Sequence, residues 1–308
     1  MLRTIRLTAA IVCFALITLL FLDFTGTLHT WFGWLAKIQF LPAVLALNIG
    51  VVLLLIVLTL LFGRIYCSVI CPLGVFQDAV SWISGKRKKN RFRYSPALRW
   101  LRYGVLTVFV IALVAGWNTF VILLAPYSAY GRMASSLLAP FWQWGNNLMA
   151  YFAERAESYA FYEVDVWMKS LSTLIIAIIT LVVLFILAWR NGRTYCNTIC
   201  PVGTILGFIS RYSIFKPVID TSKCNGCGLC ARNCKASCIN AKAHEIDYSR
   251  CVACMDCLGK CKQRAIRYTR RIPKKESATT ETVQVKSVTA EQVNNARRSF
   301  LSASAVVA

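Results

Sequence analysis

Four long runs without a charged residue constrain the fold of this chain more than any other feature. They cover residues 7–22, 38–63, 103–131 and 170–189, and are 16, 26, 29 and 20 residues long. A helix needs about 20 mostly apolar residues to cross a bilayer, so the last three are long enough. The first run can extend because only one charge, Asp23, follows it before Lys37, and without a small-residue cleavage site it is expected to stay uncleaved. The sequence therefore predicts an α-helical membrane protein with four transmembrane helices.

A fifth uncharged run, residues 133–152, is expected to lie at the membrane interface or to be re-entrant rather than to span. It contains residues whose polar or helix-interrupting character is costly in hydrocarbon: Pro140, Gln143, Gly145, Asn146 and Asn147. Trp142 and Trp144 are typical of the headgroup level.

The distribution of charge predicts the orientation. Residues 64–102 hold nine Lys/Arg and one acid, residues 126–170 hold three basic and four acidic residues, and residues 190–308 hold 20 basic and seven acidic residues. The positive-inside rule places the N-terminus, the 64–102 loop and everything after the last helix in the cytoplasm. The net charge of +22 is therefore mostly a topology signal. We expect the basic run in residues 86–93 to contact membrane lipid, with no nucleic acid as partner.

An internal repeat links the two halves. Residues 63–74 (the first cysteine motif) match residues 192–203 (the second cysteine motif) at eight of twelve positions, with the shared pattern G-R-x-Y-C-x3-C-P-x-G. Each copy follows a long apolar run at its cytoplasmic end. The four transmembrane helices are therefore expected to form two parallel repeats, related by an axis along the membrane normal.

The repeated cysteines are candidate cofactor ligands: Cys67, Cys71, Cys196 and Cys200. Cysteines four apart lie on one face of a helical turn, and the proline that follows bends the chain around them. Four thiolates could complete one metal centre if the pseudo-axis brings the copies together. A redox-active dithiol and small buried thiols remain open as alternatives, whereas a disulfide is disfavoured on the reducing side of the membrane.

Eight further cysteines carry the most specific signal, because they form two copies of C-x2-C-x2-C-x3-C. In bacterial ferredoxins the fourth cysteine of each copy binds the other cluster, and zinc knuckles do not have this arrangement. The predicted ligands of cluster one are Cys224, Cys227, Cys230 and Cys261, and those of cluster two are Cys251, Cys254, Cys257 and Cys234. Gly226 and Gly228 are expected to let the backbone wrap cluster one closely.

Several residues depart from that pattern or limit it. Lys235 and Lys262 stand where proline is usual, and a lysine beside a cluster should raise its potential. Cys238 is a spare cysteine that either replaces Cys234 or is a small buried thiol. The only histidines are His29 and His244, which excludes paired histidine ligation of haem in either half, and nucleotide-binding motifs are absent from the sequence.

These motifs resemble the NapH/NosR/MauN group of membrane polyferredoxins over residues 1 to about 271. The resemblance rests on Cys67–Pro72, Cys196–Pro201 and the eight ferredoxin cysteines. It implies a quinol dehydrogenase subunit in the bacterial inner (cytoplasmic) membrane, multi-pass, with its ferredoxin domain on the cytoplasmic side. Two [4Fe-4S] clusters, the quinone pool and a redox partner protein are the implied cofactors and partners.

We therefore expect three segments: a membrane domain (residues 1–213), a small α+β two-cluster ferredoxin-like domain (214–271) and a polar linker (272–308). The linker contains Ala296–Leu301, which resembles a twin-arginine signal. The expected function is electron transfer between quinol and a partner. The alternative is an assembly or maturation factor for another metalloenzyme, with the clusters as electron donors and the C-x3-C-P cysteines as a metal-delivery or dithiol site. A sensor is disfavoured because no signalling domain accompanies the clusters.

Overall fold

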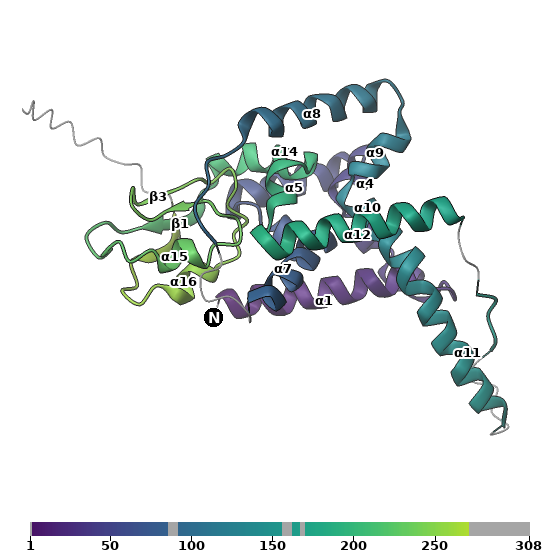
Figure 1. Ribbon diagram of the computed structural model, residues 1–308. Helices are drawn as coiled ribbons and strands as arrows, with labels where there is room; N and C mark the ends of the chain where they lie inside the picture. Colours follow the sequence, from purple (N-terminus) through teal and green to yellow (C-terminus); the bar gives the residue numbers. More distant parts are fainter. Residues whose placement is uncertain (1, 86–91, 156–161, 167–169, 271–308) are drawn as a thin grey trace, which may run out of the picture. The chain divides into compact units, whose positions relative to one another are not determined.

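Helices built from the apolar runs make up most of the chain, and a small group of strands follows them (Figure 1). The computed structural model describes residues 2–85, 92–155, 162–166 and 170–270. The predicted polar linker with its twin-arginine-like segment, and most of the basic run at 86–93, lie outside the described residues. Residues 1–271 form one compact unit, so the predicted boundary at residue 213 falls inside it and stays a prediction.

The helices in chain order are α1 (Leu2–Leu22), α2 (Thr27–Phe32), α3 (Trp34–Lys37), α4 (Phe40–Leu45), α5 (Ile49–Phe62), α6 (Tyr66–Val69), α7 (Pro72–Gly85), α8 (Arg99–Val114), α9 (Asn118–Leu124), α10 (Pro126–Met133), the π-helical turn η1 (Ala134–Leu138), α11 (Ala139–Arg155), α12 (Leu171–Asn191), α13 (Thr194–Thr198), α14 (Pro201–Ile209), the 3-10 turn η2 (Ser210–Tyr212), α15 (Leu229–Arg232) and α16 (Asp256–Lys260). Among the described residues, α1 and α12 are long and apolar enough to cross a membrane, and α5 is a shorter apolar helix.

Two of the four expected spans are not single helices. The run at 38–63 is divided between α4 and α5, where Leu47 has a positive φ of 51° and Asn48 caps α5 by accepting a hydrogen bond from Val51 N at 3.4 Å. The run at 103–131 is divided into α8, α9 and α10 by Gly116, at a φ of +75°, and by Pro126, which begins α10. Local capping and turn chemistry therefore overrides apolar continuity at both places.

The stretch at 133–152 is helical from α10 through η1 into α11 (Figure 1). Two of its amide side chains form hydrogen bonds within the protein. Asn147 donates to Val164 O at 2.7 Å and accepts from Val164 N at 3.0 Å, and Asn146 donates to Tyr162 O at 2.9 Å. Residues 162–164 therefore lie beside α11 and satisfy the polar groups of these two asparagines.

The ferredoxin segment has the predicted α+β character. β1 (Phe215–Ile219) pairs antiparallel with β4 (Ile266–Arg270), with Phe215 opposite Arg270, and β2 (Ile239–Asn240) pairs antiparallel with β3 (Glu245–Ile246). β1 precedes the eight cysteines and β4 follows them, so this pairing closes the segment around them. Its core is a cluster of aliphatic side chains and cysteines.

Direct contacts fix this segment to the helices. Ile214 N donates to Leu60 O at 2.8 Å, and Tyr268 Oη donates to Phe62 O at 2.8 Å. Arg3 Nε lies 2.8 Å from Asp256 Oδ1. The ferredoxin segment therefore packs where α1 begins and α5 ends, which is also where both cysteine motifs lie (Figure 1).

Candidate functional site

The two cysteine motifs fold alike. In each, the first cysteine lies in a short helix, α6 or α13, and the second directly precedes the proline that begins α7 or α14. Proline suits this position because the first N–H of a helix has no intrahelical partner. A Cβ on Gly74 would collide with Cys67 O, and one on Gly203 would collide with Cys196 O. The C-P-x-G pattern therefore begins a helix. The preceding turn packs against its glycine so closely that a side chain would not fit there.

The second cysteine of each motif lies at a helix N-terminus. Cys200 is the N-cap of α14, and its Sγ accepts a hydrogen bond from Gly203 N at 3.4 Å. Gly74 N makes the equivalent contact with Cys71. Backbone N–H groups and the helix dipole both favour a thiolate there.

The four cysteines of the motifs come together in the core; we call Cys67, Cys71, Cys196 and Cys200 the four-thiol site. Each is at most 4% exposed. Burial raises the pKa of the Cys71 and Cys200 thiols, and the neighbouring thiols, Cys196 among them, add to the rise. Burial raises the pKa of Cys196 to about 11 in the same way, although two arginines oppose it. Without a bound cation these three thiols are neutral at pH 7.

This donor set fits a thiolate-bound iron–sulfur cluster. In a cube each of the four cysteines binds a different iron, so three sulfurs need not meet at one atom. Among the described residues, no three His, Cys, Asp or Glu side chains are arranged around a single ion. Four thiolates contributed by two motifs match the ligand number of one cube.

Each motif contributes an arginine that reaches into the other motif. Arg64 of the first motif donates to Gly203 O at 2.6 Å and to Asn197 Oδ1. Arg193 of the second motif donates to Cys67 O at 2.7 Å. Both side chains are fully buried. These reciprocal contacts hold the two cysteine pairs against each other.

Asp78 of α7 connects three parts of the chain. Its carboxylate accepts from Arg193 at 2.8 and 2.7 Å and from Arg6 of α1 at 3.1 Å, and lies 3.7 Å from Lys235 Nζ of the ferredoxin segment. Burial by itself would raise the pKa of the Asp78 carboxyl, but the Arg193 guanidinium holds that pKa well below its usual range. The group is therefore an anion at any working pH.

Sequence reasoning did not assign roles to Arg64, Arg193, Asp78 or Gln77, whose Nε2 donates to Cys196 Sγ at 3.3 Å. A signal existed for three of them. Both arginines belong to the repeated Gly-Arg pair, and Asp78 is the single acid of the basic 64–102 loop. Gln77 has no such mark.

The structure places Cys234 of the first ferredoxin repeat beside cysteines of the second. Five cysteines line one cavity: Cys234, Cys238, Cys251, Cys254 and Cys257. Cys238 is 1% exposed and its Sγ lies 3.5 Å from Cys234 Sγ; it also hydrogen-bonds with Cys251. The spare cysteine therefore lies between two predicted ligands of cluster two.

The cysteines predicted for cluster one lie nearer to solvent. Burial raises the pKa of Cys230, and nearby Cys224 and Cys227 raise it further. Cys227 is exposed. Gly226 and Gly228 have φ values of 69° and 70°, which L side chains rarely adopt, as their expected role requires. Cys261 Sγ accepts from Ala265 N at 3.3 Å, and its assignment to cluster one stays a prediction.

The two unusual lysines differ in their surroundings. Lys235 Nζ lies 3.1 Å from Asp256 Oδ2 and 3.7 Å from Asp78 Oδ1, so nearby carboxylates offset the charge that was expected to raise the potential. Lys262 is exposed to solvent, which screens its charge.

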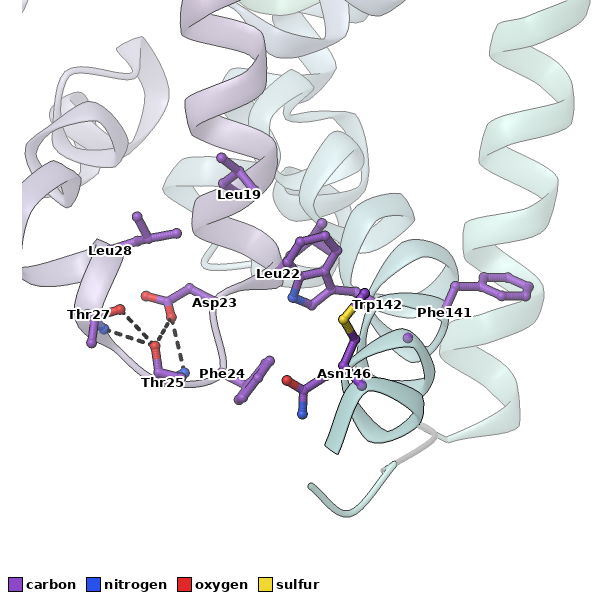
Figure 2. Close-up of a pocket in the computed structure, with 12 residues that line it drawn as sticks. Leu19, Leu22, Asp23, Phe24, Thr25, Thr27, Leu28, Phe141, Trp142 and Asn146 are labelled. Atoms are coloured by element: carbon purple, nitrogen blue, oxygen red, sulfur yellow. Dashed lines mark hydrogen bonds between the residues drawn. The ribbon is translucent and has the colours of Figure 1, made fainter. Parts of the chain in front are cut away.

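A separate cavity lies at the other end of α1, between the α1–α2 turn and α11 (Figure 2). Its lining is mostly apolar and includes Leu22, Phe24 and Trp142. The one carboxylate in its lining, Asp23, accepts hydrogen bonds from the backbone N–H groups of Thr25, Gly26 and His29. That carboxylate therefore shapes the turn, and the cysteine chemistry lies near the opposite end of the helix.

Thiol accessibility in the metal-free protein gives a first test. After anaerobic chelation in detergent at pH 7.5, we expect iodoacetamide to modify Cys227 at least about tenfold faster than Cys71 or Cys200. The reason is that alkylation needs an exposed thiolate, and burial both hides these two thiols and raises their pKa. Mass spectrometry of timed samples measures the rates. Equal rates at all three cysteines would contradict the buried four-thiol site.

Comparison with known proteins agrees with this chemistry. The model of a 4Fe-4S binding domain family matches the chain twice, at residues 44–90 and 172–220. A second 4Fe-4S binding domain family matches residues 217–240. The first two matches each contain one cysteine motif, and the third contains the first ferredoxin repeat. No solved structure matches the chain.

Curated relatives have names from one group. The ferredoxin-type protein NapH of Haemophilus influenzae is 26% identical over 63% of this chain and 55% of its own length. The methylamine utilization ferredoxin-type protein MauN of Paracoccus denitrificans is 22% identical over 60% of this chain and 53% of its own. The putative electron transport protein YccM of Escherichia coli is 26% identical over 63% and 47%. The chain spans about half the length of these relatives.

The predicted resemblance to NapH and MauN is thus confirmed by similarity across the helices as well as by the iron–sulfur domain matches. The chain is therefore similar to the NapH/MauN-type polyferredoxins and contains three matches to 4Fe-4S binding domains.

Proposed function

We propose that this protein passes electrons between the quinol pool and a redox partner protein, as a quinol dehydrogenase subunit in the bacterial inner membrane. Two [4Fe-4S] clusters bound by the ferredoxin cysteines supply the one-electron chemistry. The four-thiol site holds a further metal centre, nearer to the membrane. The observation that carries this proposal is that the four-thiol site directly adjoins the cysteines predicted for cluster two.

Two hydrogen bonds of the second cysteine motif support that adjacency. Arg193 N donates to Lys235 O at 2.9 Å, and Asn197 Nδ2 donates to Ala236 O at 3.2 Å. Lys235 and Ala236 directly follow Cys234 in the chain. The sulfurs of the four-thiol site and those predicted for cluster two are therefore close neighbours in the fold, as an electron relay requires.

Two helices long and apolar enough to cross a membrane, α1 and α12, support a membrane role. We propose that broken helices at 38–63 and 103–131 complete four crossings, together with α1 and α12. Interrupted helices are tolerated in a membrane where neighbouring groups satisfy the freed backbone. In this arrangement the N-terminus and the ferredoxin segment lie in the cytoplasm, in agreement with the charge distribution.

An assembly or maturation factor is the competing function. Metal delivery or thiol exchange needs cysteines that a client can reach, as in reactive cysteines generally. The cysteines of the four-thiol site are at most 4% exposed, and α6, α7, α13 and α14 enclose them. Burial favours a resident redox centre over a delivery site.

Anaerobic purification of the full-length chain in detergent tests the proposal. Iron and sulfide analysis should approach about eight atoms of each per protein for two cubes, and about twelve with a third cube at the four-thiol site. The reduced protein should be reoxidised by a quinone analogue. Stoichiometric zinc without iron would sink the cluster assignment. Copper or thiol exchange without quinone turnover would favour the maturation factor.

A further inference from the structure

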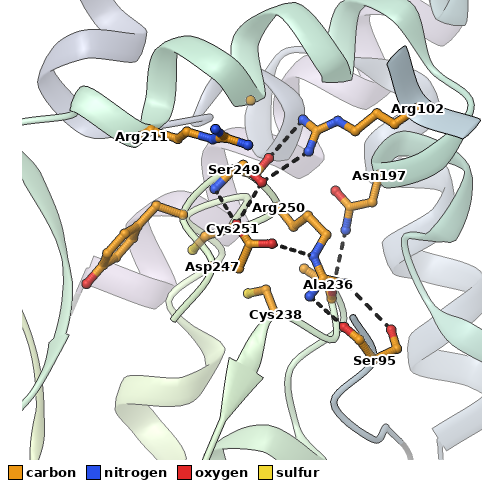
Figure 3. Close-up of polar contacts among 12 residues, drawn as sticks. Ser95, Arg102, Asn197, Arg211, Ala236, Cys238, Asp247, Ser249, Arg250 and Cys251 are labelled. Carbon is orange, nitrogen blue, oxygen red and sulfur yellow. Dashed lines mark hydrogen bonds and ion pairs between the residues drawn. The ribbon is translucent and has the colours of Figure 1, made fainter. Parts of the chain in front are cut away.

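Arginines gather where the second cysteine motif meets the ferredoxin segment, and Figure 3 shows Arg102 and Arg250 among them. Arg64, Arg102 and Arg250 are 0%, 3% and 5% exposed. Among the described residues, the only carboxylate that pairs with any of the three is Asp247, at 2.9 Å from Arg250 Nε. A buried guanidinium without a counterion is costly, so this cluster of cations indicates that an anion belongs beside it.

Arg64 and Arg102 both lack a carboxylate partner among the described residues, and Arg64 is the one of the two that is fully buried. Besides its two contacts with the second cysteine motif, it donates to Arg250 O at 3.0 Å and to Cys251 O at 3.4 Å. All its hydrogen-bond acceptors among the described residues are carbonyl or amide oxygens, which carry no net charge. Its guanidinium therefore brings a whole positive charge into a site with no exposure to water.

The equivalent residue of the second motif differs. Arg193 occupies the same position in the repeat, but its charge is neutralised by Asp78 at 2.7 Å. The repeat therefore provides two buried arginines of identical sequence context, of which one has a carboxylate and the other does not. The repeat packs with a carboxylate beside this arginine in one copy and without one in the other. The charge of Arg64 therefore needs a partner other than a carboxylate of the repeat.

Arg64 lies between two groups of predicted ligands. Its hydrogen bonds to Asn197 and Gly203 place it beside Cys196 and Cys200, and its contact with Cys251 O places it at cluster two. The predicted ligands on both sides are therefore the groups nearest to this charge, and the negative charge of centres bound there would balance it.

We propose that Arg64 is the charge shared by the four-thiol site and cluster two, which it couples as consecutive redox steps, with cluster one as the outer step. This inference rests on the proposed function. A fixed positive charge favours the reduced, more negative state of a nearby centre and so raises its potential. Cluster one lies beyond this influence, because Cys227 is exposed and water screens charges there.

The test is a redox titration of the full-length Arg64→Gln protein, followed by electron paramagnetic resonance. Removing one charge at low exposure should weaken reduction of both cluster two and the four-thiol centre about tenfold, or about 59 mV for one electron. Cluster one should be unchanged. Arg64→Lys keeps the charge and should restore most of both shifts.

Arg232→Gln is the matched control. Arg232 Nη2 donates to Cys227 O at 2.8 Å, so it also contacts the carbonyl of a predicted ligand, but it is exposed. We expect a smaller shift, confined to cluster one. Equal shifts at all centres in both variants would mean that Arg64 acts without site specificity and would overturn the proposal.

Asn197→Asp is a second route to the same result, because it puts a carboxylate against Arg64 while keeping the arginine in place. It should lower the same two potentials. Unchanged potentials in iron-replete Arg64→Gln protein overturn the inference. So does loss of iron in every variant at 64 and 197 while Arg232→Gln retains it, since that marks a structural role.

The wild-type protein distinguishes a failure of this inference from a failure of the proposed function. A preparation with ferredoxin clusters but no third titrating centre overturns the coupling and leaves electron transfer through the ferredoxin segment standing. A preparation with no iron–sulfur signal overturns the proposed function itself.

Discussion

Replacing Cys67 by serine is expected to reduce electron transfer from quinol by more than about a hundredfold while both ferredoxin clusters remain spectroscopically intact. Cys67 belongs to the four-thiol site, in which all four side chains are buried together, and loss of one ligand destroys a shared centre. Quinol-dependent reduction of an artificial acceptor by purified protein, at equal protein amount, measures the loss.

The double variant tells a shared site from two independent pairs. If the four cysteines act as one unit, Cys67→Ser with Cys196→Ser should be hardly worse than Cys67→Ser alone. Independent dithiols would give losses that multiply. Cys13→Ser is the control, since Cys13 is a half-buried cysteine of α1 outside both motifs. Near-normal turnover in Cys67→Ser would refute the shared site.

The second large effect is expected from Asp78→Asn, which should destabilise the folded protein by about 3–5 kcal/mol. The substitution leaves the buried Arg193 and Arg6, and the partly buried Lys235, without the carboxylate that they share. Thermal unfolding in detergent, followed by the loss of cluster absorbance, measures the change. Asp256→Asn is the control, because it also removes a partner of Lys235. The other partner of Asp256, Arg3, is largely exposed, so this variant should lose less stability.

The pH dependence of the same group has a definite sign. Because the pKa of Asp78 is depressed in the folded state, its contribution is fully present above the ordinary carboxyl pKa of about 4 and is lost only as the pH falls towards the lower folded value. Wild-type stability should therefore not change through Asp78 between pH 5 and pH 8. If the thermal unfolding midpoint of Asp78→Asn equals that of the wild type, the ion pairs of Asp78 are dispensable.

The sequence predicted the chemistry better than the course of the backbone. The cysteine spacing correctly indicated iron–sulfur binding, because ligand geometry allows few spacings, and β1 and β4 enclose the expected segment. The breaks at Asn48 and Gly116 were missed, since apolar content reports burial in lipid and a single turn residue decides helix continuity. The assignment of individual cysteines to clusters stays a prediction.

Long-range polar contacts were beyond the sequence for another reason. Arg64 and Asn197 are 133 positions apart, and Arg193 and Asp78 are 115 apart. A repeated Gly-Arg pair marks a residue as unusual, but it does not say which copy receives a carboxylate. That difference between the copies depends on the single acid at position 78, and only the packed structure relates the two.

The separation of Asp78 from Arg193 also has a consequence for biosynthesis. At 5–20 residues per second, a ribosome needs about ten seconds to make the 115 residues between them. During that interval the nascent chain contains the Asp78 carboxylate but not the Arg193 guanidinium. We therefore expect α7 to stay hydrated and not yet to pack over Cys67 and Cys71. If the four-thiol site holds a metal centre, as proposed, its insertion would have to wait until the second half of the polypeptide has emerged.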